Sequence, residues 1–142
     1  MLNTIARASE NFCIHQIRVP HELSDGIHQK RTLIAYIDID ADNGSRHRVY
    51  IAFEPDFIQR VSKLFLEEDE SDEETLIDMA LETVNLIVGS AKVIAEEANT
   101  NTYTINTPHF SKIDRFDFEY DQAKIIKVEN DEMIIAIKEL NG

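Results

Sequence analysis

The stretch LIAYIDIDADNGSRHRVYIAF, residues 33–53, contains two runs of β-branched and aromatic residues around a turn. The runs occupy residues 31–40 and 46–53, and the residues between them include Asn43 and Gly44. Asn-Gly between two such runs is a strong signal for a β-hairpin, because both residues tolerate the positive φ of a tight turn. The sequence therefore predicts an antiparallel pair of strands here.

A short amphipathic helix is predicted directly after this hairpin. Pro55 opens it, since the missing N–H of proline is of no consequence in the first turn of a helix. The following run, DFIQRVSKLFL, places its apolar residues at helical spacing. These residues are Phe57, Ile58, Val61, Leu64 and Phe65.

The acidic run EEDESDEE, residues 67–74, is predicted to be a solvated loop that leads into a second helix. A calcium-binding loop needs a defined ligand spacing and a central glycine, and the run has neither. Acidic residues also interact favourably with a helix N-terminus. Ser71 and Glu74 have the spacing of a capping box, which indicates that the helix begins close to them.

This second helix is long, and it is predicted from about Asp72 to Ala98 with Asn99 as its C-terminal cap. On a helical wheel its apolar residues gather on one side, which we expect to face the core. This side comprises Ile77, Ala80, Val84, Ile87, Ala91, Ile94, Ala95 and Ala98.

Further strands are predicted after the long helix. Residues 102–108 and 112–120 are expected to be partly strand. Residues 123–130 and 132–140 are expected to form a second hairpin that turns at Asn130–Asp131.

The N-terminal part is predicted to be less regular. Residues 1–12 are a short helix or a loose arm, residues 12–20 alternate like a strand, and residues 21–30 have the composition of a loop. Hairpins on both sides of a helical pair predict an α+β fold, in which a long and a shorter helix pack on a mostly antiparallel sheet. We expect one domain over residues 1–142.

The composition limits the classes of partner. The chain has 27 acidic and 14 basic residues and a net charge of −13, which disfavours binding to nucleic acid or to anionic membranes. Cys13 is the sole cysteine, so no intramolecular disulfide can form, and it is expected to be a small buried hydrophobe. The N-terminus lacks an apolar run of signal-peptide length, and we expect a cytoplasmic protein.

No metal or cofactor site of the chain's own is predicted. The histidines lack the spacing of a zinc site, and the glycines are too dispersed for a phosphate-binding loop. The histidines are His15, His21, His28, His47 and His109.

A polar stripe runs along the long helix opposite the predicted core face. Asp78, Glu82, Asn85 and Gly89 are four, three and four residues apart, so they follow one another along the helix surface. Asn and Gly are poor helix formers, and helix stability does not account for them. By itself the stripe also fits an ordinary solvated helix face.

Apolar residues border this stripe. Met79, Leu86 and Val93 lie beside it, and Gly89 removes bulk from it. Such a surface is suited to docking another protein.

The pattern resembles the motif of the CheC/CheX/FliY family of chemotaxis phosphatases. In that motif Asp or Ser, Glu and Asn are followed at a fixed distance by Pro, and Asp78, Glu82, Asn85 and Pro108 meet each spacing. One copy is present, as in the CheX-like branch. Residues 1–12 are shorter than the N-terminal helix usual in the family.

The resemblance implies a phosphatase that hydrolyses the aspartyl phosphate of a CheY-like response regulator. Asn85 would position the attacking water, Glu82 would pair with the partner's active-site lysine, and Asp78, Gly89 and Pro108 would support the site. The partner would supply Mg²⁺, and the chain would need no cofactor of its own. Single-motif relatives are homodimers, so we expect a homodimer formed through exposed strand edges.

Two alternatives remain open. The chain could be a non-catalytic docking module for a receiver domain or for a flagellar-switch component. It could also be an α+β domain that only dimerises. The amide of Asn85 favours the phosphatase over a pure binding module, which has no need of it.

Overall fold

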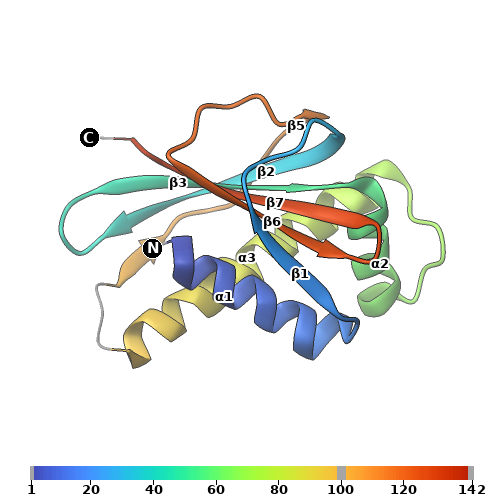
Figure 1. The fold of residues 1–142 in the computed structure, drawn as a ribbon, viewed down its shortest axis with the longest axis horizontal. Coiled ribbons are helices and arrows are strands. Elements are labelled where there is room, and N and C mark those ends of the chain that lie inside the picture. The colour runs from blue at the N-terminus through green and yellow to red at the C-terminus, as the bar shows by residue number, and fades with distance from the viewer. Residues whose placement is uncertain (1, 99–101, 141–142) are drawn as a thin grey trace.

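The computed structural model describes residues 2–98 and 102–140. In these residues seven strands form one antiparallel sheet (Figure 1). The strands are β1 (His21–Asp25), β2 (Arg31–Ala41), β3 (Arg46–Phe53), β4 (Tyr103–Ile105), β5 (His109–Arg115), β6 (Gln122–Val128) and β7 (Asp131–Glu139). Their order is β1-β6-β7-β3-β2-β4, and β5 also pairs with β2. The predicted α+β fold is confirmed.

The β2–β3 hairpin is confirmed together with its turn. Gly44 adopts a φ of +89° there, and the N–H of Ser45 donates to Asn43 Oδ1 at 3.0 Å. Alternate residues of β2 enter the same apolar core as the helices. These are Leu33, Ala35, Ile37 and Ile39.

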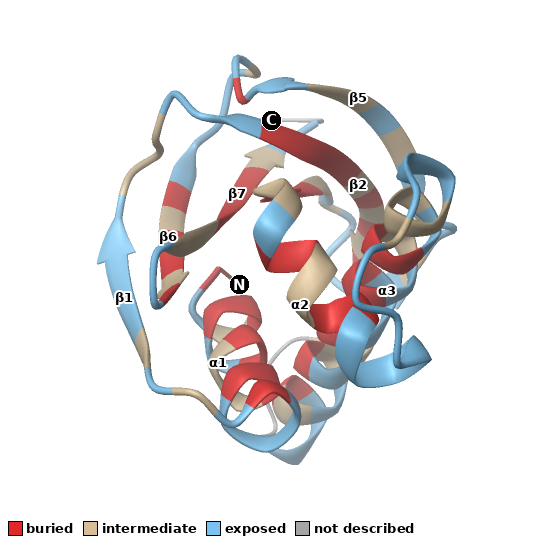
Figure 2. Ribbon diagram, turned by 90° about the vertical axis from the view of Figure 1, so that its right-hand side faces the viewer, coloured by how far each residue is buried: buried red, intermediate tan, exposed pale blue. Residues whose placement is uncertain are grey.

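The helices α1 (Leu2–Phe12), α2 (Pro55–Leu66) and α3 (Glu73–Glu97) all lie on one side of the sheet. α1 packs against α3, and α2 contacts α3, β2, β3 and β7. Figure 2 shows α2 enclosed by buried strands and flanked by the other two helices. The two predicted helices are confirmed, and of the two alternatives for residues 1–12 the helix is the one present. None of the helices in the described ranges is long and apolar enough to span a membrane.

The opposite face of the sheet carries a smaller apolar cluster. Phe116 and Phe118, which follow β5, pack on Tyr50 of β3 with ring centroids 5.5 Å and 4.8 Å away. Both faces of the central strands are therefore partly covered, which explains why neighbouring residues of β3 and β7 are buried in succession.

The acidic loop is exposed over residues 67–70, as predicted, but α3 begins with a different cap. Asp72 is the N-cap, and its Oδ1 accepts from the N–H of Thr75 at 2.8 Å. Hydrogen bonds from Thr75 hold the pKa of Asp72 below its usual value. The Ser71–Glu74 capping box was wrong, because the Ser71 hydroxyl hydrogen-bonds Ser62 at 2.6 Å instead.

The N-terminal prediction was only partly right. The short helix, one of the two alternatives for residues 1–12, is present, whereas the strand expected at 12–20 was wrong. Residues 2–12 form a full helix that continues as one π-helical turn, η1 (Cys13–Ile17), and Arg18 ends it with a φ of 61°. Over so short a window the alternating pattern of residues 12–20 also fits helical spacing. Packing of α1 against α3 and of η1 against α2 decides for the helix. Cys13 is fully buried, and burial raises the pKa of its thiol to about 12, as expected of an unreactive hydrophobe.

Three further segments differ from prediction. The segment predicted as a loop at 21–30 begins with β1. This strand pairs with β6, and no local sequence pattern predicts that pairing. The β6–β7 turn is at Glu129–Asn130, one residue earlier than expected. The strand expected within 112–120 is β5, which starts earlier, and the Asn99 cap lies outside the described residues.

Candidate functional site

The polar stripe lies on the outer surface of α3. Asp78, Glu82 and Asn85 are exposed, and Gly89 is partly exposed. The helix takes this orientation because its apolar face is buried against the sheet and α1. The residues that fix it include Ala80, Val84, Ile87 and Ala91, each no more than 1% exposed.

The functional groups of the stripe are available to a partner. No hydrogen bond or ion pair joins the side chains of Asp78, Glu82 or Asn85 to any residue within 2–98 or 102–140. Glu82 and Asn85 are three residues apart on the same helix, so their side chains are neighbours. A free carboxylate and a free carboxamide are thus presented together to solvent.

Packing in the described structure does not require a glycine at position 89. A Cβ built on Gly89 meets no atom within 4 Å, and its φ is not in the left-handed region. Glycine within a helix costs roughly 1 kcal/mol relative to alanine. No contact in the described structure therefore explains this glycine.

The apolar border of the stripe is only partly as predicted. Leu86 and Val93 are 43% and 51% exposed, whereas Met79 is 7% exposed and belongs to the core. The side chain of Met79 is therefore not part of an exposed docking surface. Its carbonyl accepts from the Thr83 hydroxyl at 2.7 Å, which satisfies a buried polar group.

Pro108 lies in the link between β4 and β5, both of which contact α3. Hydrogen bonds hold both β4 and the link in place. The Tyr103 hydroxyl donates to the Val88 carbonyl at 3.0 Å, one residue before Gly89, and Asn106 Nδ2 donates to the Asp38 carbonyl at 2.9 Å. A fixed φ at Pro108 suits the shaping role expected of it.

The structure brings together one group that the sequence did not reveal. Ligand atoms of His28, Glu54 and Glu132 lie within 4.8 Å of one another, although the residues are far apart in sequence. Two contacts argue against a metal site. The Lys30 ammonium pairs with Glu132, and the Lys30 N–H donates to His28 Nδ1 at 3.1 Å, which leaves the ring proton on Nε2. The group fits an ion-pair network that joins the loop after β1 to β7.

Comparison with known proteins gives the family. The model of the family described as chemotaxis phosphatase CheX matches residues 34–130, a range that includes α3 and Pro108. The chain belongs to the chemotaxis phosphatase CheX family. No curated protein sequence matches it.

Solved structures share the CheX fold over almost the whole chain. The chemotaxis protein CheX of Vibrio vulnificus is 17% identical, with 97% of each chain covered and a TM-score of 0.77. A chemotactic CheC-like protein of Shewanella oneidensis is 12% identical, with 96% of each covered and a TM-score of 0.77. The matched chain in a CheX–CheY–BeF3–Mg²⁺ complex of Borrelia burgdorferi is 14% identical, with 97% of each chain covered and a TM-score of 0.68.

Proposed function

We propose that the chain hydrolyses the aspartyl phosphate of a CheY-like response regulator. The observation that carries the proposal is the free amide of Asn85, held on the exposed face of α3 beside the carboxylate of Glu82. Family membership supports it, as does the likeness to a CheX that is found in complex with CheY.

Asn85 is assigned to the water. In the reaction a water oxygen attacks phosphorus, the P–O bond to the aspartate breaks, and inorganic phosphate leaves. Phosphoryl transfer depends mainly on in-line placement and charge stabilisation. An amide oxygen can accept a hydrogen bond from the water while its NH₂ donates to a phosphoryl oxygen, and the amide adds no negative charge.

Glu82 is assigned to docking. Its carboxylate, one helical turn from Asn85, would pair with the lysine of the receiver's active site and so set the position of the amide. Asp78 extends the same acidic face by one turn and would strengthen attraction of that lysine.

The metal belongs to the partner in this proposal. The receiver would bring Mg²⁺ and the phosphoryl group, and the chain would contribute only the side chains of α3. The Borrelia complex contains both CheY and Mg²⁺, which supports this division.

The direct test is a dephosphorylation assay. Purified receivers of the same cell are phosphorylated, and phosphoryl loss is followed with and without a catalytic amount of the chain. We expect faster loss for the cognate receiver only. Binding of the phosphorylated receiver with no acceleration would instead favour the non-catalytic docking module.

Gly89 supplies a separate prediction. Gly89→Ala should raise the free energy of unfolding by about 0.5–1 kcal/mol, because alanine is the better helix former and the new methyl meets no neighbour. The same variant should slow dephosphorylation if a partner approaches the bare backbone.

Urea unfolding and the phosphatase assay measure the two effects. Gly44→Ala is the control, and it should destabilise the protein, since Gly44 has a φ of +89°. A Gly89→Ala protein with full activity would show that the partner does not use this patch.

Homodimer formation and a cytoplasmic location stay predictions. The outer edge of β1 is unpaired in the described residues, and the strand is mostly exposed, so β1 is a candidate for pairing between subunits. Sedimentation velocity at several concentrations would give the mass, and a monomer throughout would contradict the prediction.

A further inference from the structure

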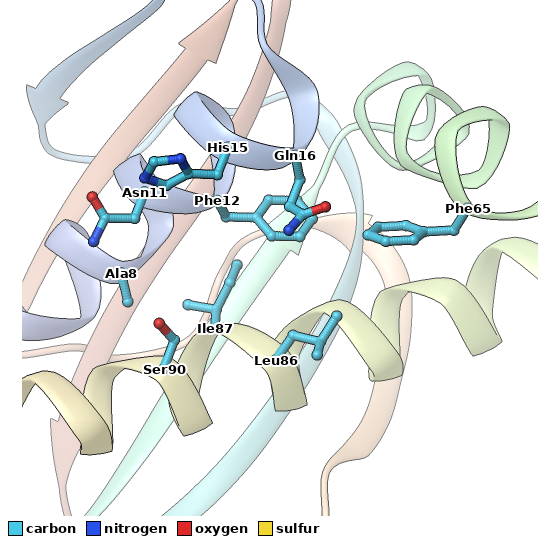
Figure 3. Close-up of a pocket in the computed structure, with 9 residues that line it drawn as sticks. All are labelled: Ala8, Asn11, Phe12, His15, Gln16, Phe65, Leu86, Ile87 and Ser90. Carbon is cyan, nitrogen blue, oxygen red and sulfur yellow. The ribbon is translucent and has the colours of Figure 1, made fainter.

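A pocket of about 320 Å³ lies beside the candidate site, between α1 with η1, the end of α2 and the middle of α3. Its apolar lining includes Phe12, Phe65, Leu86 and Ile87. Figure 3 shows the rings of Phe12 and Phe65 on one side of the space, opposite the side chains of α3. Their centroids are 6.2 Å apart.

The rim of the pocket is polar, and among the described residues that form it the single ionisable side chain is a histidine. It is formed by Asn11, His15, Gln16 and Ser90. No hydrogen bond ties these side chains to another residue in the described part of the chain. In a chain with a net charge of −13, such a pocket is suited to an apolar side chain whose backbone bonds to the rim.

Exposed hydrophobic side chains are concentrated on the elements around this pocket. Phe65 is 41% exposed and Leu86 43%, and further exposed residues lie in η1 and at the end of α2. These are Ile14, Leu64 and Leu66. Apolar exposure around a pocket with a polar rim is typical of a protein-binding surface.

The pocket is continuous with the acidic stripe. Leu86 is one turn after Glu82 and one turn before Ser90, so one row on α3 joins the carboxylate to the pocket. A partner whose lysine reaches Glu82 along this row would also contact Leu86. The acidic stripe therefore favours a cationic group of the partner, and the pocket beside it favours an apolar group of the same partner.

We propose that the receiver inserts an apolar side chain, located close to its active-site lysine, into this pocket. The contact would anchor the complex and help to choose the cognate receiver. This inference rests on the proposed function, in which the receiver's lysine pairs with Glu82.

Filling the pocket tests the inference. Ser90→Phe places a ring in it from an exposed position on α3, and Asn130→Phe places a ring in the exposed β6–β7 turn as a control. We expect Ser90→Phe to raise KM for the phosphorylated receiver, and Kd for its beryllofluoride form, about ten-fold with kcat within about twofold. Asn130→Phe should change neither.

The outcomes separate the two proposals. An active wild type whose KM is unaffected by Ser90→Phe would overturn the pocket assignment, as would a lower kcat at constant KM. A wild type that binds without hydrolysis, and loses binding in Ser90→Phe, would support the pocket and overturn the phosphatase. Absence of binding would overturn both.

A second variant guards against a folding artefact. Gln16→Phe fills the same pocket from η1, where the side chain is exposed, and should reproduce the rise in KM. These variants could change the mass of the assembly in solution without changing the affinity for the receiver. In that case a second copy of the chain occupies the pocket, and the inference is wrong.

Discussion

Asn85→Ala should reduce the rate of phosphoryl hydrolysis about 100-fold or more, the usual consequence of removing one positioned polar group from a transition state. The receiver would still dock through Glu82, so its Kd should change little. The side chain is exposed and makes no contact that the fold requires, and alanine favours the helix, so the free energy of unfolding should not fall. Single-turnover hydrolysis and binding to the beryllofluoride-loaded receiver measure the two quantities.

Asn85→Asp is the sharpest companion variant, because it keeps the shape and replaces the NH₂ with a negative oxygen. Repulsion from the phosphoryl oxygens should make it as inactive as alanine and also weaken binding. Near-normal hydrolysis by Asn85→Ala would remove the assigned mechanism. Near-normal hydrolysis by Asn85→Asp would show that shape, and not the amide, is what matters.

Glu82→Ala should weaken binding of the phosphorylated receiver about 30-fold, corresponding to about 2 kcal/mol, because it leaves the partner's lysine without its counter-charge. The rate should also fall, since Asn85 would no longer be held in register with the phosphorus. Titrations at low and high salt would measure the affinity. The salt dependence of the variant should be weaker than that of the wild type.

Glu97→Ala is the matched control. Glu97 is an exposed glutamate at the C-terminal end of the same helix, and its replacement should leave both affinity and rate unchanged. Glu82→Gln keeps the length of the side chain and loses the charge. If Glu82→Gln binds as tightly as wild type, then a hydrogen bond and not an ion pair sets the docking. Equal losses in Glu82→Ala and Glu97→Ala would indicate a general effect of the net charge.

Local patterns were most reliable where the chemistry of one segment allows a single solution. The Asn43-Gly44 turn fixes the β2–β3 hairpin, and the spacing of apolar residues fixes α3 and thereby exposes Asp78, Glu82 and Asn85. Local patterns failed at residues 12–20, where two periodicities fit the same short run. Packing of α1 against α3 and of η1 against α2 decided between them.

Long-range contacts also changed the meaning of single residues. Met79 belongs to the border of the stripe by its position on the helix, yet it is buried, because the core extends further around α3 than the wheel indicated. Leu64 and Phe65 belong to the apolar face of α2 by spacing, yet both are exposed. Phe65 instead meets Phe12 across the pocket, a pairing of residues from two separate helices.

The sequence by itself determined the fold class, the long helix and the solvent-facing row of Asp78, Glu82 and Asn85, because turn chemistry and helical periodicity act over a few neighbouring residues. Only the tertiary structure decided that α1 lies against α3, that a Cβ at position 89 would meet no described neighbour, and that an apolar pocket adjoins the row. Those properties depend on which distant segments bury one another's surface, and that free energy belongs to the assembled layers and not to any one stretch of the chain.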